Sequence, residues 1–451
     1  MNHLRICIAA LAILSILPAC GKKDAGCKLD SECPSGQICR NMKCEADPAN
    51  AQAAQNQQNN DAAKDAANDA AKDQAPDADK TATKPKIIPP DALSDNQSVK
   101  LEDLGLDIDY ILDGDLNLND NTKLEIGPGV TIDMQSSSAG FTINNDAALI
   151  VKGTAESPVI IKSTNSSVWA GISFYSKNKD NALNYLQLFN ADGEEQVINL
   201  GSEARVAIDH LTLDGSANNG IVIGPDAKLI KFTNNTIKNC KGYPLVLNHY
   251  EQIAQIGDGN QYENNKQFIR INPNYFDNVQ TTVIKKQPIP FLMADGMNVD
   301  GESGTLTIEP GVEFVFEHEK DARIGGSIQV KIEGTPENPV IMRGLNDEAN
   351  YWYGLFIDTT RPSSISGLQL ANTGCGETTS LRIRSEADVA LSNITFKPTD
   401  HRCLEIGSDA KINNKGGLTF EKCGAGNIFD IRIDGDDAQR TLAEIPVTAA
   451  E

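Results

Sequence analysis

The chain has 451 residues, enough for two or three ordinary domains or for one elongated repeat array, which escapes the size limit on a single core. Its formal net charge is −22, and adjacent basic residues occur only as pairs, such as Lys22-Lys23, and never as a longer cluster. This balance argues against nucleic acid or an anionic membrane surface as the main partner.

The first twenty residues resemble the signal sequence of a bacterial lipoprotein. Arg5 is followed by an apolar run over residues 6–17, too short to span a bilayer, and then by Leu-Pro-Ala-Cys. The resemblance implies that a signal peptide, residues 1–19, is removed and that Cys20 carries acyl chains such as palmitate, which anchor the protein in a lipid bilayer. Gly21 is typical of sorting to the outer membrane. An ordinary cleaved secretory signal is the alternative.

Residues 20–45 are predicted to form a small Cys-rich module behind the anchor. The stretch has no long apolar run and cannot build a core, so two disulfides are expected to hold it, in one of three pairings. Export favours disulfides over metal thiolates, and a zinc site is the weaker alternative because no C-x-x-C pair is present and no His lies nearby. The cysteines concerned are Cys27, Cys33, Cys39 and Cys44.

Residues 46–98 are predicted to be a disordered linker. They contain no aromatic residue and no Gly, and Ala, Asp, Asn, Gln and Lys dominate. Such a composition buries too little apolar surface to offset the entropy lost on ordering the chain.

From residue 99 onward, short runs alternate apolar and polar residues between Gly, Asn, Asp and Pro, which predicts an all-β region. The region is written twice: LEIGPGVTI at residues 124–132 returns as LTIEPGVEF at residues 306–314, and other phrases return at an offset of 181 to 183 residues. We therefore expect two copies, residues 99–281 and residues 282–451, the second ending in a cap or tail.

Within each copy the strands recur about every 20 to 25 residues, the length of one coil of a solenoid. In a solenoid each strand pairs with its equivalent one coil away, and alternate side chains form inward ladders. Pro128-Gly129 and Pro310-Gly311 suit the corners, since Pro fixes φ and Gly accepts the positive φ of a type II turn.

The phrases LTIEPGV, W-x-G-[IL] and L-x-L-x-N resemble the right-handed parallel β-helix proteins of the pectin-lyase-like superfamily over residues 108–430. The resemblance implies a tandemly duplicated right-handed parallel β-helix. It says much less about activity.

Four cysteines lie in the predicted β-helix. Cys240 and Cys423 are equivalent positions of the two copies, too far apart in a stack to bond to each other, and are expected to be buried thiols. Cys375 and Cys403 are about one coil apart and are candidates for a disulfide between neighbouring coils. Cys403 with Cys423 is the rival pairing.

No catalytic set is predicted. The motifs G-x-S-x-G and H-E-x-x-H are absent, and the chain has only five His. Asp209 and His210, in VAIDH, are similar to a segment near the calcium site of pectate lyases, but the second copy has Ser392 and Asn393 there, so the pair is interpreted as a corner.

No cofactor and no metal ligands are predicted. Ca²⁺ is the alternative, suggested by residues 113–121, which lack the full EF-hand register. Three acidic residues near the C-terminus are assigned to the cap or tail and not to catalysis; they are Asp434, Asp436 and Asp437.

The two Trp residues occupy equivalent positions. Trp169 and Trp352 both stand in W-x-G, and Tyr351 and Tyr353 flank the second. Each Trp is expected to cover the end of a coil, and exposed rings that stack on sugars are the alternative. If a glycan site exists, Tyr351, Trp352 and Tyr353 are its candidate residues.

The leading functional hypothesis is a non-catalytic envelope or cell-surface lipoprotein, anchored to the outer membrane, that presents its β-helix to a polysaccharide or a surface protein. Its partners would be the lipid bilayer, through Cys20, and that ligand, and no nucleic acid. A polysaccharide lyase or glycoside hydrolase of the β-helix type is one alternative. A structural spacer is another.

Overall fold

The structure is a computed structural model. The residues described are 37–40, 43–46, 84–90, 92–93, 95–165, 168–191, 196–272, 275–276, 279–384, 386–407, 410–414, 416–424, 431–433 and 447–449. The predicted signal sequence, Cys20, Cys27, Cys33, most of the predicted linker and the three C-terminal Asp residues lie outside them. The chain divides into two units, Met1–Ala78 and Asp79–Glu451.

The first unit contains a β-hairpin in its described part. Strands β1 (Gln37–Arg40) and β2 (Lys43–Ala46) pair antiparallel. Their register places Cys39 opposite Cys44. A two-stranded hairpin is at best marginally stable alone, so the predicted disulfides would have a stabilising role here.

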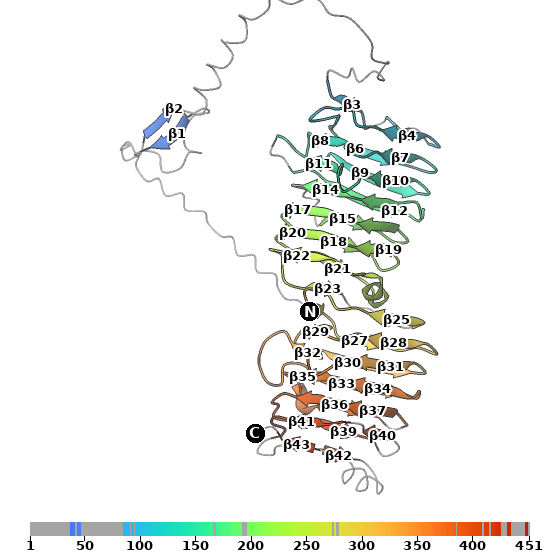
Figure 1. Ribbon diagram of the computed structural model, residues 1–451, viewed down its shortest axis with the longest axis vertical. Helices are drawn as coiled ribbons and strands as arrows, with labels where there is room; N and C mark the ends of the chain where they lie inside the picture. Colours follow the sequence, from blue (N-terminus) through green and yellow to red (C-terminus); the bar gives the residue numbers. More distant parts are fainter. Residues whose placement is uncertain are drawn as a thin grey trace, which may run out of the picture. The chain divides into compact units, whose positions relative to one another are not determined.

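The second unit is a solenoid in which all strand pairing between sheet neighbours is parallel, and Figure 1 shows its coils stacked from β3 to β43. Two sheets lie in the first copy and in the residues just before it. The six-stranded sheet contains β4 (Ser98–Leu101), β7 (Lys123–Ile126), β10 (Ala148–Lys152), β13 (Ala182–Asn184), β16 (Arg205–Asp209) and β19 (Lys228–Thr233). The eight-stranded sheet contains β3 (Lys86–Ile88), β5 (Tyr110–Leu112), β8 (Thr131–Met134), β11 (Val159–Lys162), β14 (Leu186–Phe189), β17 (Thr212–Ser216), β20 (Thr236–Cys240) and β22 (Gln261–Glu263).

One sheet runs through both copies. Its fourteen strands are β6 (Asp115–Leu118), β9 (Gly140–Asn145), β12 (Gly171–Ser176), β15 (Gln196–Leu200), β18 (Asn219–Ile223), β21 (Leu245–Leu247), β23 (Ile269–Ile271), β26 (Phe291–Met293), β29 (Glu313–Phe316), β32 (Val340–Gly344), β35 (Leu368–Leu370), β38 (Ile394–Phe396), β41 (Leu418–Phe420) and β43 (Val447–Ala449).

Two sheets lie mainly in the second copy and begin just before it. The seven-stranded sheet contains β24 (Tyr275–Phe276), β27 (Met297–Val299), β30 (Asp321–Gly326), β33 (Gly354–Thr359), β36 (Leu381–Ile383), β39 (Leu404–Ile406) and β42 (Ile431–Ile433). The six-stranded sheet contains β25 (Thr281–Ile284), β28 (Thr305–Ile308), β31 (Gln329–Glu333), β34 (Ser363–Ser366), β37 (Asp388–Ser392) and β40 (Lys411–Asn414).

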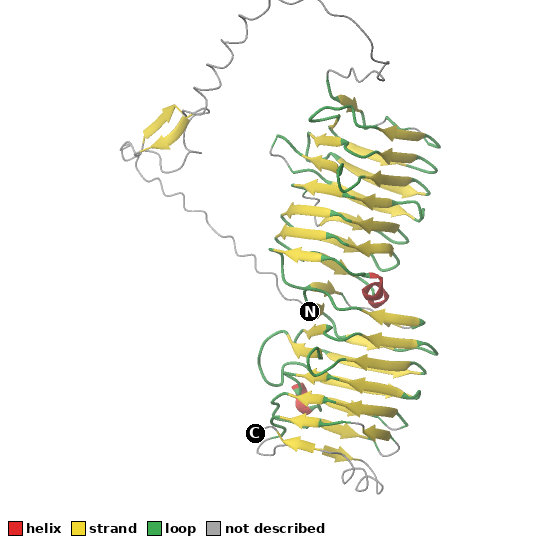
Figure 2. Cartoon of the chain, in the orientation of Figure 1, coloured by secondary structure: helices red, strands yellow, loops and turns green. Residues whose placement is uncertain are grey.

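Only short helical turns interrupt the strands in the described residues. They are the 3₁₀ turns η2 (Tyr250–Gln255) and η3 (Cys375–Glu377), shown in red in Figure 2. No helix in the part of the chain described here is long and apolar enough to cross a membrane.

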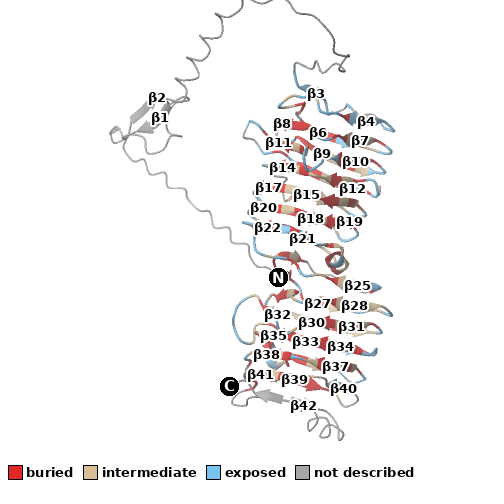
Figure 3. Cartoon of the chain, viewed as in Figure 1, coloured by how far each residue is buried: buried red, intermediate tan, exposed pale blue. Residues whose placement is uncertain are grey.

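The core is a set of aliphatic ladders inside the coils. One ladder runs through Ile126, Val151, Leu183, Ile208 and Phe232, which pair in register and are at most 1% exposed. Figure 3 shows buried residues in the strands along the stack. Each coil thus buries its apolar side chains against its neighbours, as the repeat pattern predicts.

The corners need residues with unusual backbone conformations or with capping amides. Gly129 and Gly311 have φ of 80° and 77°, which confirms the predicted Pro-Gly corners. At another corner, buried Asn235 accepts a hydrogen bond from the amide of Leu211 at 2.9 Å, and Asn260 accepts one from the amide of Asn235 at 3.1 Å. These side chains satisfy backbone donors that no strand reaches.

Equivalent strands of the two copies do not all lie in the same or corresponding sheets. The repeated phrase places β7 and β28 at equivalent positions, each in a six-stranded sheet, but β8 lies in the eight-stranded sheet and its equivalent β29 in the fourteen-stranded one. At the junction β23 pairs with β21 of the first copy and β26 of the second, and η2 packs against β19 and β25. The first strand of the stack, β3, lies in the segment expected to be linker.

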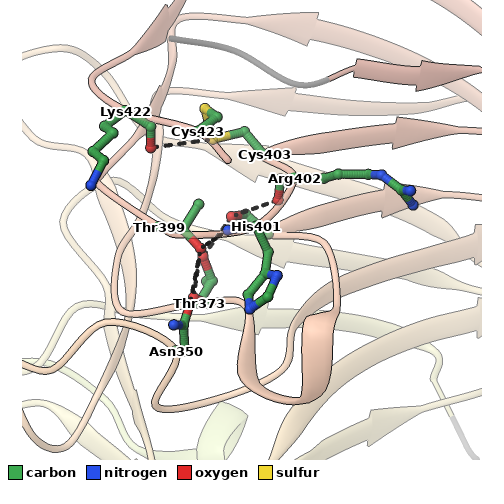
Figure 4. Close-up of a disulfide and its surroundings, with 9 residues drawn as sticks. Asn350, Thr373, Thr399, His401, Arg402, Cys403, Lys422 and Cys423 are labelled. Carbon is green, nitrogen blue, oxygen red and sulfur yellow. Dashed lines mark hydrogen bonds between the residues drawn. A yellow bond between two sulfur atoms is a disulfide. The ribbon is translucent and has the colours of Figure 1, made fainter. Parts of the chain in front are cut away.

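The disulfide of the second copy joins Cys403 to Cys423, with 5.5 Å between their Cα atoms (Figure 4). The expected pairing of Cys375 with Cys403 is therefore wrong, and the rival pairing is correct. The physical reason is that η3 directs Cys375 to the preceding coil, where its amide donates to the carbonyl of Trp352 at 3.1 Å. Cys240 is a buried free thiol, as expected, and Cys423 is not free.

Candidate functional site

The Asp209 corner is a structural hydrogen-bond cluster. The Asp209 carboxylate accepts hydrogen bonds from Lys231 at 2.8 Å, Thr233 at 2.5 Å and Asn234 at 3.1 Å. His210 has φ of 56°, places Nδ1 3.1 Å from the same carboxylate and stacks on Tyr185. These donors occupy the oxygens that a metal ion or substrate would need.

Hydrogen bonding decides the charge of Asp209. Burial works to raise the pKa of this carboxyl, but the hydrogen bonds from Lys231, Thr233 and Asn234 outweigh it and hold the pKa well below its ordinary value of 3.8. A carboxyl with a lowered folded-state pKa stabilises the fold above its unfolded pKa, and this stability is lost as the pH falls through the folded pKa.

We therefore expect Asp209→Asn to destabilise its coil at pH 7 and to make a progressively smaller difference as the pH falls below 3.8, the ordinary pKa of this carboxyl. Hydrogen exchange of β16 and β19 at several pH values measures this difference. Asp226→Asn, at an exposed carboxyl, serves as the control. A difference between wild type and Asp209→Asn that stays constant with pH would contradict the assignment.

The predicted glycan residues do not form an aromatic platform. Trp352 is fully buried, stacks on Phe316 with ring centroids 4.2 Å apart and donates from Nε1 to the carbonyl of Ala371 at 2.7 Å. Trp169 is likewise buried and donates to the carbonyl of Phe189 at 2.9 Å. The expectation that each Trp covers a coil is confirmed, and a sugar-stacking role for the Trp352 ring is wrong because the ring is fully buried against Phe316. Tyr351 and Tyr353 are half-buried, and their glycan role stays a prediction.

A cleft with a different composition lies where three coils of the first copy meet the junction. We call it the Tyr243 cleft; its volume is about 430 Å³, and it is lined by Ala217, Asn218, Asn219, Lys241, Gly242, Tyr243, Val246, Lys266, Arg270 and Asn272. The residues come from the loops before β18, β21 and β23, from these three strands themselves and, for Asn272, from the position after β23.

Backbone hydrogen bonds hold the three loops in register. The amide of Gly242 donates to the carbonyl of Asn218 at 2.9 Å, and the amide of Lys266 donates to the carbonyl of Gly242 at 3.1 Å. The amide of Tyr243 donates to the Asn219 side chain at 2.9 Å. A side chain at Gly242 would meet the Asn219 Oδ1 atom at 2.5 Å, so only Gly lets the loops approach this closely.

Tyr243 organises the basic groups of the cleft. The Lys266 ammonium lies 4.7 Å and the Arg270 guanidinium 5.4 Å from the centre of the Tyr243 ring. Arg270 also donates to the Tyr243 hydroxyl at 3.3 Å and to Asn272 at 2.8 Å. These contacts pre-order two long cationic side chains, which lowers the entropy that a ligand would have to remove.

The cleft is electropositive in a strongly acidic protein. Its lining contains Lys241, Lys266 and Arg270 and no Asp or Glu. Glu317 lies near the cleft: its carboxylate is 3.7 Å from the Arg270 guanidinium, and both side chains are partly exposed. Ammonium and guanidinium donors beside Asn amides suit carboxylate, sulfate or phosphate groups.

A second cleft, the η2 cleft, has mixed charge. It also measures about 430 Å³ and is lined by Lys177, Glu203, Arg205, Pro225, Asp226, Ala227, Lys228, His249, Glu251, Gln252 and Gln255. The His249 imidazole accepts a hydrogen bond from the amide of Glu251 as the N-cap of η2. This cleft brings together carboxylates of the kind that glycoside chemistry requires.

Neither cleft was predicted. The sequence does hold one signal: Lys241 and Lys266 lie 25 residues apart, the separation of stacked corner residues such as Asn239 and Asn264. Basic residues that recur at the coil spacing align on one side of a solenoid. Arg270 and Tyr243 carry no such signal, because they meet through a loop contact.

The comparisons with known proteins concern the first copy. Residues 96–201 match a family model described as a pectate-lyase-like beta helix domain. No curated protein and no solved structure matches the chain. The match covers part of the first copy, and the parallel ladders continue from it through the second copy; together they support a right-handed β-helix of the pectin-lyase-like type.

Proposed function

We propose that this protein is a lipid-anchored, non-catalytic envelope protein whose β-helix binds an anionic polysaccharide at the Tyr243 cleft. The observation that carries the proposal is the convergence of Lys241, Lys266 and Arg270 on a cleft lining without carboxylates. Anchoring through Cys20, in the outer membrane, follows from the resemblance of the first residues to lipoprotein signals.

The ligand class follows from the charges. A polysaccharide with uronate or sulfate groups presents anions at regular spacing, and the guanidinium of Arg270 can bind such a group through two parallel hydrogen bonds. The rest of the protein repels polyanions, since the whole chain has a net charge of −22. Binding should therefore be confined to the cleft and weakened by salt.

The test is binding of a soluble polyuronate to the full-length chain, measured by calorimetry at low and physiological salt. We expect Arg270→Gln and Lys266→Gln each to weaken binding by about tenfold, because each removes a charge-assisted contact worth about 1.5 to 3 kcal/mol. Lys177→Gln and Lys228→Gln in the η2 cleft are matched controls that should bind normally.

An uncharged polysaccharide is the ligand control and should not bind. Equal binding of both polymers, or wild-type affinity in the Lys241→Gln, Lys266→Gln, Arg270→Gln triple variant, would remove the proposal. A structural spacer would bind neither polymer.

The η2 cleft favours the second candidate, a polysaccharide lyase or glycoside hydrolase. Glu203, Asp226 and Glu251 lie beside Arg205 and His249 around one opening. Release of unsaturated or reducing sugar from a polysaccharide panel, abolished by Glu203→Gln or Glu251→Gln, would establish an enzyme and displace the binding proposal.

A further inference from the structure

Three side chains with different metal-binding atoms converge at one corner of the second copy. They are His318, Glu319 and Cys375, and their ligand atoms all lie within 4.8 Å of one another. His318 and Glu319 belong to the turn between β29 and β30, and Cys375 lies in η3 two coils of sequence later. His318 and Glu319 are exposed, and Cys375 is 9% exposed.

The fold holds the two segments on either side of the buried Trp352. The amide of Glu319 donates to the carbonyl of Tyr351 at 3.1 Å, and the amide of Cys375 donates to the carbonyl of Trp352 at 3.1 Å. The His318 ring meets the edge of the Tyr351 ring with 5.2 Å between centroids. The three ligand-bearing residues therefore all contact one short segment, Tyr351 and Trp352, which lies just before β33.

The backbone conformation around Cys375 fixes the direction of its thiol. Gly374 and Gly376 on either side of Cys375 have φ of 101° and 62°, a left-handed conformation that Gly adopts readily. The tight turn removes Cys375 from the disulfide of the same region and leaves its thiol unpaired beside the imidazole and the carboxylate.

We propose that His318, Glu319 and Cys375 form a binding site for a zinc ion. Thiolate sulfur, imidazole nitrogen and carboxylate oxygen are the donors that Zn²⁺ takes, at about 2.0 to 2.3 Å, in tetrahedral sites. Such bonds place donors about 3.3 to 3.8 Å apart, so the exposed His318 and Glu319 side chains close the remaining distance by rotating toward the less mobile thiol. The fourth position is open to water or to a ligand atom.

The donor set selects against the common hard cations. Ca²⁺ and Mg²⁺ take oxygen ligands, and this site offers one carboxylate with a sulfur and a nitrogen. Burial, and after it the nearby Glu319 charge, raise the pKa of the Cys375 thiol above its ordinary value. A bound dication reverses this effect, since a coordinated thiol is deprotonated.

The test uses the full-length chain titrated with Zn²⁺ and with Co²⁺, which reports thiolate ligation through a sulfur-to-cobalt charge-transfer band. We expect Cys375→Ser to remove the charge-transfer intensity contributed by this site. His318→Ala and Glu319→Gln should each weaken Zn²⁺ binding by about tenfold or more. Ca²⁺ in excess should not displace the zinc.

Cys240→Ala, which removes the other buried free thiol, is the matched control and should leave the band and the affinity unchanged. The N-terminal cysteines are present in every variant, so their contribution cancels in the comparison. His318→Ala and Glu319→Gln alter exposed side chains and keep the fold. A cobalt spectrum and a zinc affinity of Cys375→Ser that match those of the wild type would overturn the site, as would wild-type zinc affinity in both of the other variants.

Discussion

Replacing Trp352 with alanine is expected to destabilise the middle coils of the second copy by about 3 to 5 kcal/mol. The substitution removes a fully buried indole, its hydrogen bond to the Ala371 carbonyl and its stack on Phe316. Because each coil of a solenoid contacts only its neighbours, the loss should be local. Hydrogen exchange of β33 and β36 measures it directly.

Trp169→Ala provides a matched control from the first copy. Trp169 is equally buried and makes the equivalent hydrogen bond, but Met134 stands where the second copy has Phe316. An aromatic pair adds about 1 kcal/mol beyond burial, so Trp352→Ala should cost more than Trp169→Ala by about this amount. Trp352→Phe should recover most of the loss. Unchanged exchange in β33 and β36 would show that the ring does not support the coil.

Removing the Cys403–Cys423 disulfide is expected to lower the free energy of unfolding of the last coils by about 3 kcal/mol, the value for a closed loop of about 20 residues. The double variant Cys403→Ala with Cys423→Ala should exchange its amide hydrogens faster in β39 and β41. The strands of the first copy should be unaffected, since they share no coil with the disulfide.

Cys240→Ala is the control for this experiment because it deletes a buried sulfur without breaking a cross-link. If the double variant speeds amide exchange in β39 and β41 no more than Cys240→Ala speeds it in β20, the disulfide stabilises the coils only through the packing of its sulfur atoms. Non-reducing peptide mapping should recover Cys403 and Cys423 in one linked species and Cys375 as a free thiol.

Most of the β-helix could be predicted from the sequence because the repeat acts at short range. In β7, buried Leu124 and Ile126 alternate with polar Lys123 and Glu125, and their ladder partners Leu149 and Val151 each follow 25 residues later, the expected length of one coil. The Pro-Gly corners are equally local, since Gly129 and Gly311 need only a positive φ. The start of the stack was less predictable: β3 contributes Ile88 to the core from a segment whose composition resembles linker.

Cysteine pairing shows where coil spacing stops being a guide. The spacing of Cys375 and Cys403 matches one coil, but η3 turns Cys375 toward Trp352, and a shorter coil brings Cys423 to Cys403. The length of a coil varies with its loops. The loop conformations depend on which φ region each glycine adopts, and the sequence does not show this. A spacing of one coil therefore predicts proximity for strand residues better than for loop residues.

The two copies also differ in ways that comparison of their sequences does not reveal. The equivalents β8 and β29 lie in different sheets because the junction, with η2 and β23, shifts the second copy relative to the first. At the offset of 183 that relates Cys240 to Cys423, Gly426 stands at the position of Tyr243, so the repeat carries no aromatic residue there. This explains why alignment of the copies discounted the Asp209 corner but did not point to Tyr243.

The sequence by itself determined the all-β class, the duplication, the inward ladders, the buried Trp pair and the expectation of a lipid anchor, because each depends on residue type and on spacing along the chain. The tertiary structure alone decided that Lys266 and Arg270 meet over Tyr243, that Cys375 faces His318 and Glu319, and that Cys403 bonds Cys423. These contacts join side chains from loops of different coils. Their meeting depends on loop length, turn conformation and the offset between copies, which only the folded stack brings together.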